Sequence, residues 1–173
     1  VSGQSFTFDW KKATPVKNVT DKEEVVYVDK AANRYIIFRE PESVSDPFMW
    51  MEDYTYPEGL TKKTSIKINI GTFGEASFYK EYLNANDGFL LFYRGWSKSA
   101  KKSSYEVRKC SYDGNFNEEG TELMSHTAKN QIKAGSYDIS LSPDKSSFAV
   151  VCGLPFAKGE KEKMMVKEIQ TIQ

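Results

Sequence analysis

The chain repeats one pattern three times. Each copy has an apolar residue, then polar residues that form turns, then a short run of apolar and aromatic residues. The copies are Val28–Arg39, Leu83–Arg94 and Leu141–Cys152, so their starts are almost evenly spaced along the chain. A period of this length predicts a supersecondary unit that stacks on its neighbours, because one unit cannot bury its apolar face alone.

The apolar runs inside the copies are too short for buried helices. Each is short and rich in β-branched and aromatic side chains, which is typical of strands. Because these runs are continuous and do not alternate with polar residues, they indicate strands buried on both faces, as between stacked sheets. The Asn, Asp, Gly and Ser residues before them favour reversal of the chain. A high aromatic content of 14% agrees with a strand-rich fold.

A second strand is expected after the core strand of each copy. Tyr105–Cys110 follows Phe89 at the same distance along the chain as Met164–Ile169 follows Phe148. In the first copy, Ser65–Ile70 is expected to be the equivalent strand. A longer loop over residues 40–62 would precede it.

Two further elements complete the second copy. Asp113-Gly114-Asn115 predicts a hairpin turn, which leads to an outer strand over residues 121–125. Residues 76–83 are expected to form the innermost strand of this copy, in preference to a short helix.

The sequence therefore predicts an all-β fold of antiparallel four-stranded blades of a β-propeller. The predicted repeats cover residues 22–72, 73–130 and 131–173 of a single β-rich domain over residues 1–173. About three blades make an incomplete ring, because propellers typically close with four or more. Either the chain is a segment of a longer protein, which we favour, or a partner completes its sheets. A β-sandwich of similar strand content is the alternative.

One turn carries a resemblance to a known family. Ser142-Pro143-Asp144 precedes a core strand that starts at Phe148, and this arrangement resembles the blade signature of TolB-like and WD40-like propellers. Lys145 stands where those families usually have glycine, and the other two copies keep only the turn character. The resemblance implies a periplasmic or extracellular bacterial protein that binds other proteins, or an accessory domain of a peptidase.

Charge and hydropathy limit the classes of partner. The chain has 24 Lys plus Arg against 24 Asp plus Glu. Because proteins that bind nucleic acid usually carry a basic excess, we expect no nucleic-acid partner. No stretch reaches the roughly 20 apolar residues of a membrane-spanning helix, so we expect no membrane span. The sequence begins at Val1, for which a cleaved secretory signal is one explanation.

Few residues suit catalysis or metal binding. Cys110 and Cys152 both fall in expected strands, where a free Cys behaves as a small buried hydrophobe. His126, the only histidine, lies in a polar stretch without a nucleophile motif and is expected at the surface or in a turn. We therefore expect no catalytic residue, no metal and no cofactor, and interpret the chain as a non-enzyme.

Two acidic motifs could in principle form sites. Asp113-Gly114-Asn115 opens like a calcium loop, but Glu118 stands where the loop requires Gly, which favours a simple hairpin turn. Glu52-Asp53 offers two carboxylates near aromatic residues, as in a glycosidase, but neighbouring acids on a loop are usually just solvated.

An aromatic and methionine cluster in the 40–62 loop is the candidate binding site. Such residues are enriched at the centres of protein interfaces, and loops carry function more often than strands do. The alternative is that the loop folds back and caps the first blade. The candidate interaction residues are Phe48, Met49, Trp50, Met51, Tyr54 and Tyr56.

These features favour an interaction or scaffold module of an exported β-propeller protein, with a protein partner. Two alternatives stay open. The chain could be the propeller portion of a peptidase or other hydrolase whose catalytic residues lie outside it. It could also be a carbohydrate-binding module that uses its aromatic residues.

Overall fold

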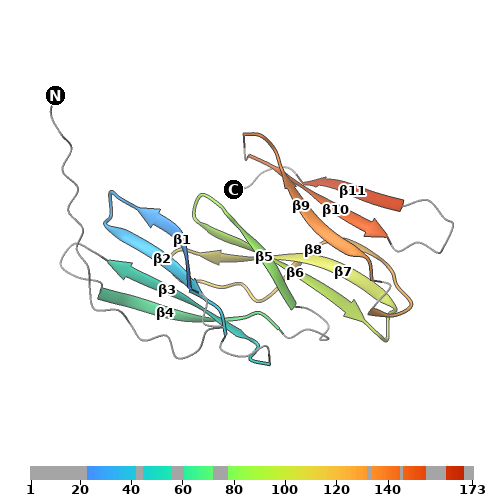
Figure 1. Ribbon diagram of the computed structural model, residues 1–173, viewed down its shortest axis with the longest axis horizontal. Helices are drawn as coiled ribbons and strands as arrows, with labels where there is room; N and C mark the ends of the chain where they lie inside the picture. Colours follow the sequence, from blue (N-terminus) through green and yellow to red (C-terminus); the bar gives the residue numbers. More distant parts are fainter. Residues whose placement is uncertain are drawn as a thin grey trace.

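The protein is built from three antiparallel β-sheets (Figure 1). The computed structural model describes residues 23–41, 45–55, 61–71, 78–131, 134–144, 146–154 and 163–169. Sheet 1 consists of β1 (Glu23–Asp29), β2 (Arg34–Arg39), β3 (Phe48–Thr55) and β4 (Thr61–Asn69). Sheet 2 consists of β5 (Phe78–Asn84), β6 (Gly88–Ser97), β7 (Lys102–Ser111) and β8 (Thr121–Thr127). Sheet 3 consists of β9 (Ser136–Leu141), β10 (Phe148–Leu154) and β11 (Lys163–Ile169).

Each sheet is a meander in which strands that follow one another along the chain pair side by side. Every strand pair is antiparallel. The prediction of an all-β, antiparallel fold is therefore confirmed. In the part of the chain that the structure describes, no helix is both long enough and apolar enough to cross a bilayer.

The predicted core strands are confirmed. The three apolar runs become β2, β6 and β10, each the second strand of its sheet. The expected innermost strand of the second copy is β5, and the strands expected from the matched spacing are β7 and β11. The turn at Asp113 also forms, because the Ser111 amide donates to the Asn115 carbonyl at 2.9 Å and β8 follows.

The expected loop over residues 40–62 is wrong. Residues 48–55 form β3, which pairs with β2 and is thus the strand equivalent to β7 and β11. The strand that contains Ser65 is β4, the fourth of its sheet. The strand was missed because Phe48–Met51 are all apolar and two acids follow, so the sequence lacks the alternation of apolar and polar residues that indicates a half-buried strand.

The three sheets pack face to face through two separate cores. One core joins sheet 1 to sheet 2 and includes Phe38 and Phe89. The other joins sheet 2 to sheet 3 and includes Phe92 and Phe148. The central strand β6 supplies both cores from opposite faces, since neighbouring side chains of a strand alternate. Sheet 2 is therefore covered on both faces, as the continuous apolar run at 89–93 predicted.

One glycine allows the β6–β7 pair to form. A Cβ atom at Gly88 would lie 2.2 Å from the Cys110 carbonyl oxygen and 2.7 Å from the Cα of Ser111. No side chain can occupy that space, because both obstacles are backbone of β7. Gly88 thus fixes the point where the strand enters the sheet.

The cysteines are free and buried, as expected for small hydrophobic side chains. Cys110 lies in the core between sheets 1 and 2, where its Sγ is 3.7 Å from the Met51 Sδ. Cys152 lies in the other core. A disulfide between them does not form, because the two cores lie on opposite faces of sheet 2.

Candidate functional site: the outer face of sheet 1 and an inter-sheet pocket

The structure separates the predicted interaction residues into two groups. Met49 and Met51 are 2% and 0% exposed and point into the core against sheet 2. Phe48, Trp50 and Tyr54 are half-buried and alternate with them, so they lie on the opposite face of β3. Tyr56 lies outside the described residues. The candidate site is thus a sheet face rather than a loop, and the methionines are core residues.

The face of sheet 1 turned away from sheet 2, here called the outer face, carries stacked and paired side chains. Tyr35 and Tyr54 stack with ring centroids 5.2 Å apart. The Trp50 ring lies between two cations, since the Arg39 Cζ and the Lys67 Nζ are each 5.8 Å from its centroid. These side chains come from neighbouring strands in register, so the backbone pairing itself sets their spacing.

Apolar side chains extend this face onto β1. Val25 and Val28 are 58% and 50% exposed. Between Val25 and Tyr27 a bulge shifts the pairing of β1 with β2 by one residue. A bulge changes which side chains share a face. Here both valines lie in solvent on the outer face, Val28 opposite Tyr35 and Val25 opposite Ile37.

The acids Glu52 and Asp53 are not solvated, which corrects the sequence-based interpretation. Glu52 is 3% exposed and accepts hydrogen bonds from Arg39 Nη2 (3.0 Å) and Tyr54 Oη (2.7 Å). Asp53 is 7% exposed and accepts from Arg34 Nε at 2.9 Å. Each arginine comes from β2, so cross-strand pairing compensates the burial of both charges. Because the two acids point to opposite faces of β3, they cannot flank one glycosidic bond.

Electrostatics on the outer face favour neutral tyrosine. Burial raises the pKa of Tyr54, and the hydrogen bond to Glu52 raises it further. Burial and the charge of Glu23 raise the pKa of Tyr35 in the same way. Both phenols remain protonated over the physiological range, and the Tyr54 hydroxyl keeps its hydrogen bond to Glu52.

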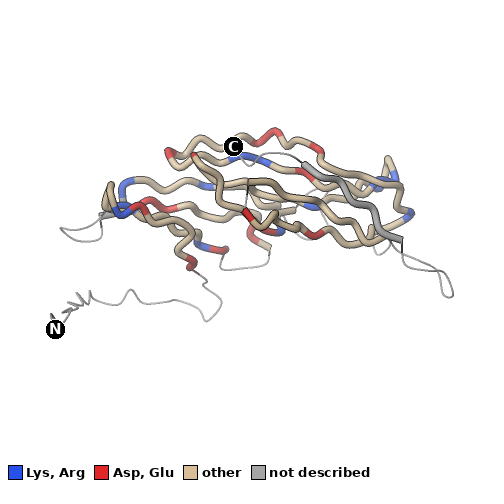
Figure 2. Tube along the Cα trace, turned by 90° about the horizontal axis from the view of Figure 1, so that it is seen from above, with Lys and Arg blue, Asp and Glu red and all other residues tan. Residues whose placement is uncertain are grey.

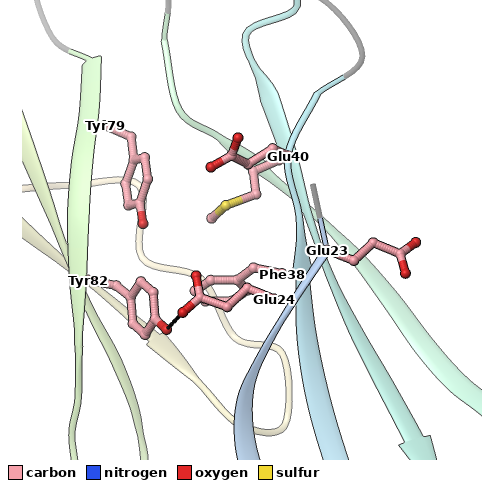
Figure 3. A pocket seen from close by; sticks show the side chains of 7 residues that line it. Glu23, Glu24, Phe38, Glu40, Tyr79 and Tyr82 are labelled. Carbon is pink, nitrogen blue, oxygen red and sulfur yellow. Dashed lines mark hydrogen bonds between the residues drawn. The ribbon is translucent and has the colours of Figure 1, made fainter. Parts of the chain in front are cut away.

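A pocket of about 370 Å³ opens between sheets 1 and 2 (Figure 3). It lies beside the first strands of both sheets. Its lining consists of Glu23, Glu24, Phe38, Glu40, Met49, Tyr79 and Tyr82. Tyr82 Oη donates to Glu24 Oε1 at 2.8 Å and so joins β5 to β1 across the opening. Figure 3 shows that the Glu24 carboxylate points toward Tyr82, whereas the carboxylate of the adjacent Glu23 turns to the other side. No sequence pattern signals this pocket, since residues from separate strands of two sheets form it.

The expected surface position of His126 is wrong. The residue lies on β8 and is half-buried against sheet 3, where its Nδ1 is 3.0 Å from Tyr137 Oη and 3.7 Å from Cys152 Sγ. Burial lowers the pKa of His126 and raises the pKa of Cys152. Both shifts favour neutral groups, whereas a catalytic Cys–His pair needs a thiolate.

In the turn at Asp113, the carboxylate oxygens accept hydrogen bonds from residues of the same turn. Ser111 Oγ and the side-chain amide of Asn115 both donate to the Asp113 carboxylate. The backbone amide of Asn115 also donates to it, at 3.3 Å. These bonds lower the pKa of Asp113. Among the described residues, no group of three His, Cys, Asp or Glu side chains has the spacing of a metal site.

Charged side chains are distributed over the whole molecule. Figure 2 shows Lys and Arg interspersed with Asp and Glu along the strands and turns. Comparison of the chain with protein-family models, with curated proteins and with solved structures gives no match.

Proposed function

We propose that this chain is a non-enzymatic β-propeller-type segment that serves as an interaction or scaffold module of an exported bacterial protein. The observation that carries the proposal is that the first strand of sheet 2, β5, contacts the first strands of both other sheets. Tyr82 on β5 bonds to Glu24 on β1. Lys80 on the same strand lies 3.3 Å from Asp138 on β9 and donates to the Tyr137 carbonyl.

This order supports a blade-like arrangement. In a propeller each four-stranded sheet places its first strand nearest a common axis and packs its faces on the next blade. The contacts of β5 with both β1 and β9 fit that order. Coverage of both faces of sheet 2 fits it too. The Ser142-Pro143-Asp144 turn adds the resemblance to TolB-like and WD40-like repeats, and export rests on that resemblance.

The outer face of sheet 1 is the proposed contact surface. Its half-buried aromatic residues, its two exposed valines and its cations are the side chains expected at the centre and rim of an interface. Trp50 is its proposed anchor, because Trp is the residue most often found to dominate interface energies. A protein is the proposed occupant, because aromatic and aliphatic side chains with a cationic rim are typical of protein interfaces.

A site-specific cross-linking experiment tests this proposal. Trp50 is replaced by a photoreactive phenylalanine derivative in the full-length protein, produced in its own cells. The matched control carries the same group at Lys98, an exposed turn residue. We expect a covalent protein adduct from position 50 and none from position 98. Equal adduct yields at the two positions, or none at either, would overturn the contact surface.

A stability measurement separates a contact surface from a core element. Trp50→Ala and Val28→Ala should each reduce the partner yield and lower the free energy of unfolding by at most about 1 kcal/mol, because Val28 is 50% exposed and Trp50 lies on the outer face of its sheet. Losses of several kcal/mol from both variants would instead make these residues part of the core.

A further inference from the structure

The inter-sheet pocket combines two kinds of lining. The carboxylates of Glu24 and Glu40 supply negative charge, whereas that of Glu23 turns to the other side. Apolar and aromatic walls come from Phe38, Met49, Tyr79 and Tyr82. Among the lining residues that the structure describes there is no Lys or Arg, although the whole chain is neutral. The pocket is therefore a locally negative cavity with aromatic walls.

One carboxylate of the pocket is held in place before any ligand arrives. Glu24 accepts the hydrogen bond from Tyr82. The Tyr82 ring is itself fixed, because it packs edge-on against Phe38 (5.1 Å between centroids) and Phe89 (6.0 Å). A group that is already ordered loses less entropy on binding. The Glu24 carboxylate is thus prepared to meet a charged ligand at the wall of the cavity.

The second tyrosine, Tyr79, lies close to the same carboxylates. Burial raises the pKa of Tyr79 most, and the neighbouring Tyr82, Glu24, Tyr93 and Glu40 raise it further. A cation placed between these groups would be stabilised by the same charges and by the faces of the rings.

The geometry favours an organic cation over a metal ion. A divalent ion needs several oxygen ligands within about 2.0–2.6 Å of one point, and the described glutamates do not converge in that way. A hydrogen-bonding cation on an apolar stem fits better, since its head can meet carboxylates while its stem lies against the half-buried rings of Tyr79 and Tyr82. We propose that this pocket binds an alkylammonium or guanidinium group, as carried by a free amine or by a Lys or Arg side chain.

This proposal does not rest on the proposed function, because the pocket faces sheet 2 and the contact surface lies on the other face of sheet 1. The test is a titration of the isotope-labelled chain, followed by the amide signals of β1 and β5. Three probes are compared: the peptide acetyl-Gly-Lys-Gly-amide, butylamine, and a peptide with neutral norleucine in place of Lys. We expect saturable shifts with the two cations, with weaker binding at higher salt, and none with the norleucine peptide.

Three variants locate the site. Glu24→Gln keeps an acceptor for Tyr82 but removes the charge, and it should weaken binding about fivefold. Tyr79→Leu should weaken it about two- to fivefold through loss of the ring face. Glu119→Gln, at an exposed position in the β7–β8 connection, removes the same charge far from the pocket and should leave binding unchanged. Retained amide dispersion shows that each variant is folded.

The outcomes separate the sources of the ligand. Binding of butylamine as tight as that of the Lys peptide identifies a free amine as sufficient, whereas binding of the peptide several-fold tighter identifies a protein side chain. The proposal is overturned if the Lys peptide gives no saturable shift, if the norleucine peptide binds equally well, or if Glu24→Gln has no larger effect than Glu119→Gln.

Discussion

Truncation of two phenylalanines on β6 tests the stacking of the three sheets. Phe89 and Phe92 are both 0% exposed, but they belong to different cores. The Phe89 ring contacts Phe38 of sheet 1, with 4.7 Å between centroids. The Phe92 ring contacts Phe148 of sheet 3 at 5.3 Å. Each substitution therefore reports on one inter-sheet core.

The size of each effect follows from burial and ring contacts. Replacement of a buried Phe by Ala usually costs about 3–5 kcal/mol. Phe89 packs against three aromatic rings, those of Phe38, Tyr82 and Tyr112. Since each such pair adds about 0.5–1.5 kcal/mol, we expect Phe89→Ala to lower the free energy of unfolding by about 4–5 kcal/mol. Phe92 has two ring partners, so about 3–4 kcal/mol is expected for Phe92→Ala.

Urea unfolding followed by circular dichroism measures these losses. Because they approach the total stability of many domains, Phe→Leu variants at the same positions provide milder versions, with about 1 kcal/mol expected for each. The two Leu substitutions should be additive within about 0.5 kcal/mol, since the side chains share no ring partner. A loss below about 1 kcal/mol for either Ala variant would refute coverage of that face of sheet 2.

Three further outcomes follow from the same structure. Gly88→Ala should destabilise the fold by about 2 kcal/mol or more in thermal unfolding, because its Cβ would overlap the backbone of β7; an unchanged midpoint would contradict the close approach. Cys110, whose pKa burial raises to about 12, should resist iodoacetamide at pH 8 in the native protein and react after unfolding; rapid native labelling would show that this core opens. Since burial lowers the pKa of His126 below its usual 6.5, the unfolded state binds its proton first. Stability should therefore fall as the pH drops from 7 through the folded pKa, and His126→Gln should reduce that slope in urea titrations at pH 7 and pH 5; equal slopes for wild type and variant would contradict this assignment.

Sequence-based prediction succeeded best where one strand alone determines the pattern. The run at 89–93 is continuous because both faces of β6 are buried. Turn residues such as Asp113 and Asp144 bond their own neighbouring backbone, so local composition is enough to place them. Strand order followed in sheet 2, because meanders pair neighbours along the chain, but not in sheet 1, where β3 was expected to be a loop.

The errors came from interactions between strands that are distant in sequence. The sequence indicates that Glu52 and Asp53 are solvated, whereas in the structure arginines of β2 form ion pairs with both. Phe48–Met51, which stand directly before these acids, were expected in a loop because they do not alternate with polar residues. They form β3. His126 is half-buried because Tyr137 and Cys152 of sheet 3 lie against it. The pocket between sheets 1 and 2 depends on how two sheets meet, which no local pattern encodes.

The most direct test of the blade-like arrangement is an experimental structure of the intact protein together with its mass in solution. We predict that sheet 2 lies between sheets 1 and 3, that β1, β5 and β9 lie nearest one axis, and that another protein surface covers Trp50. Two sheets packed as a simple sandwich, or a monomer with the Trp50 face open to solvent, would contradict the account.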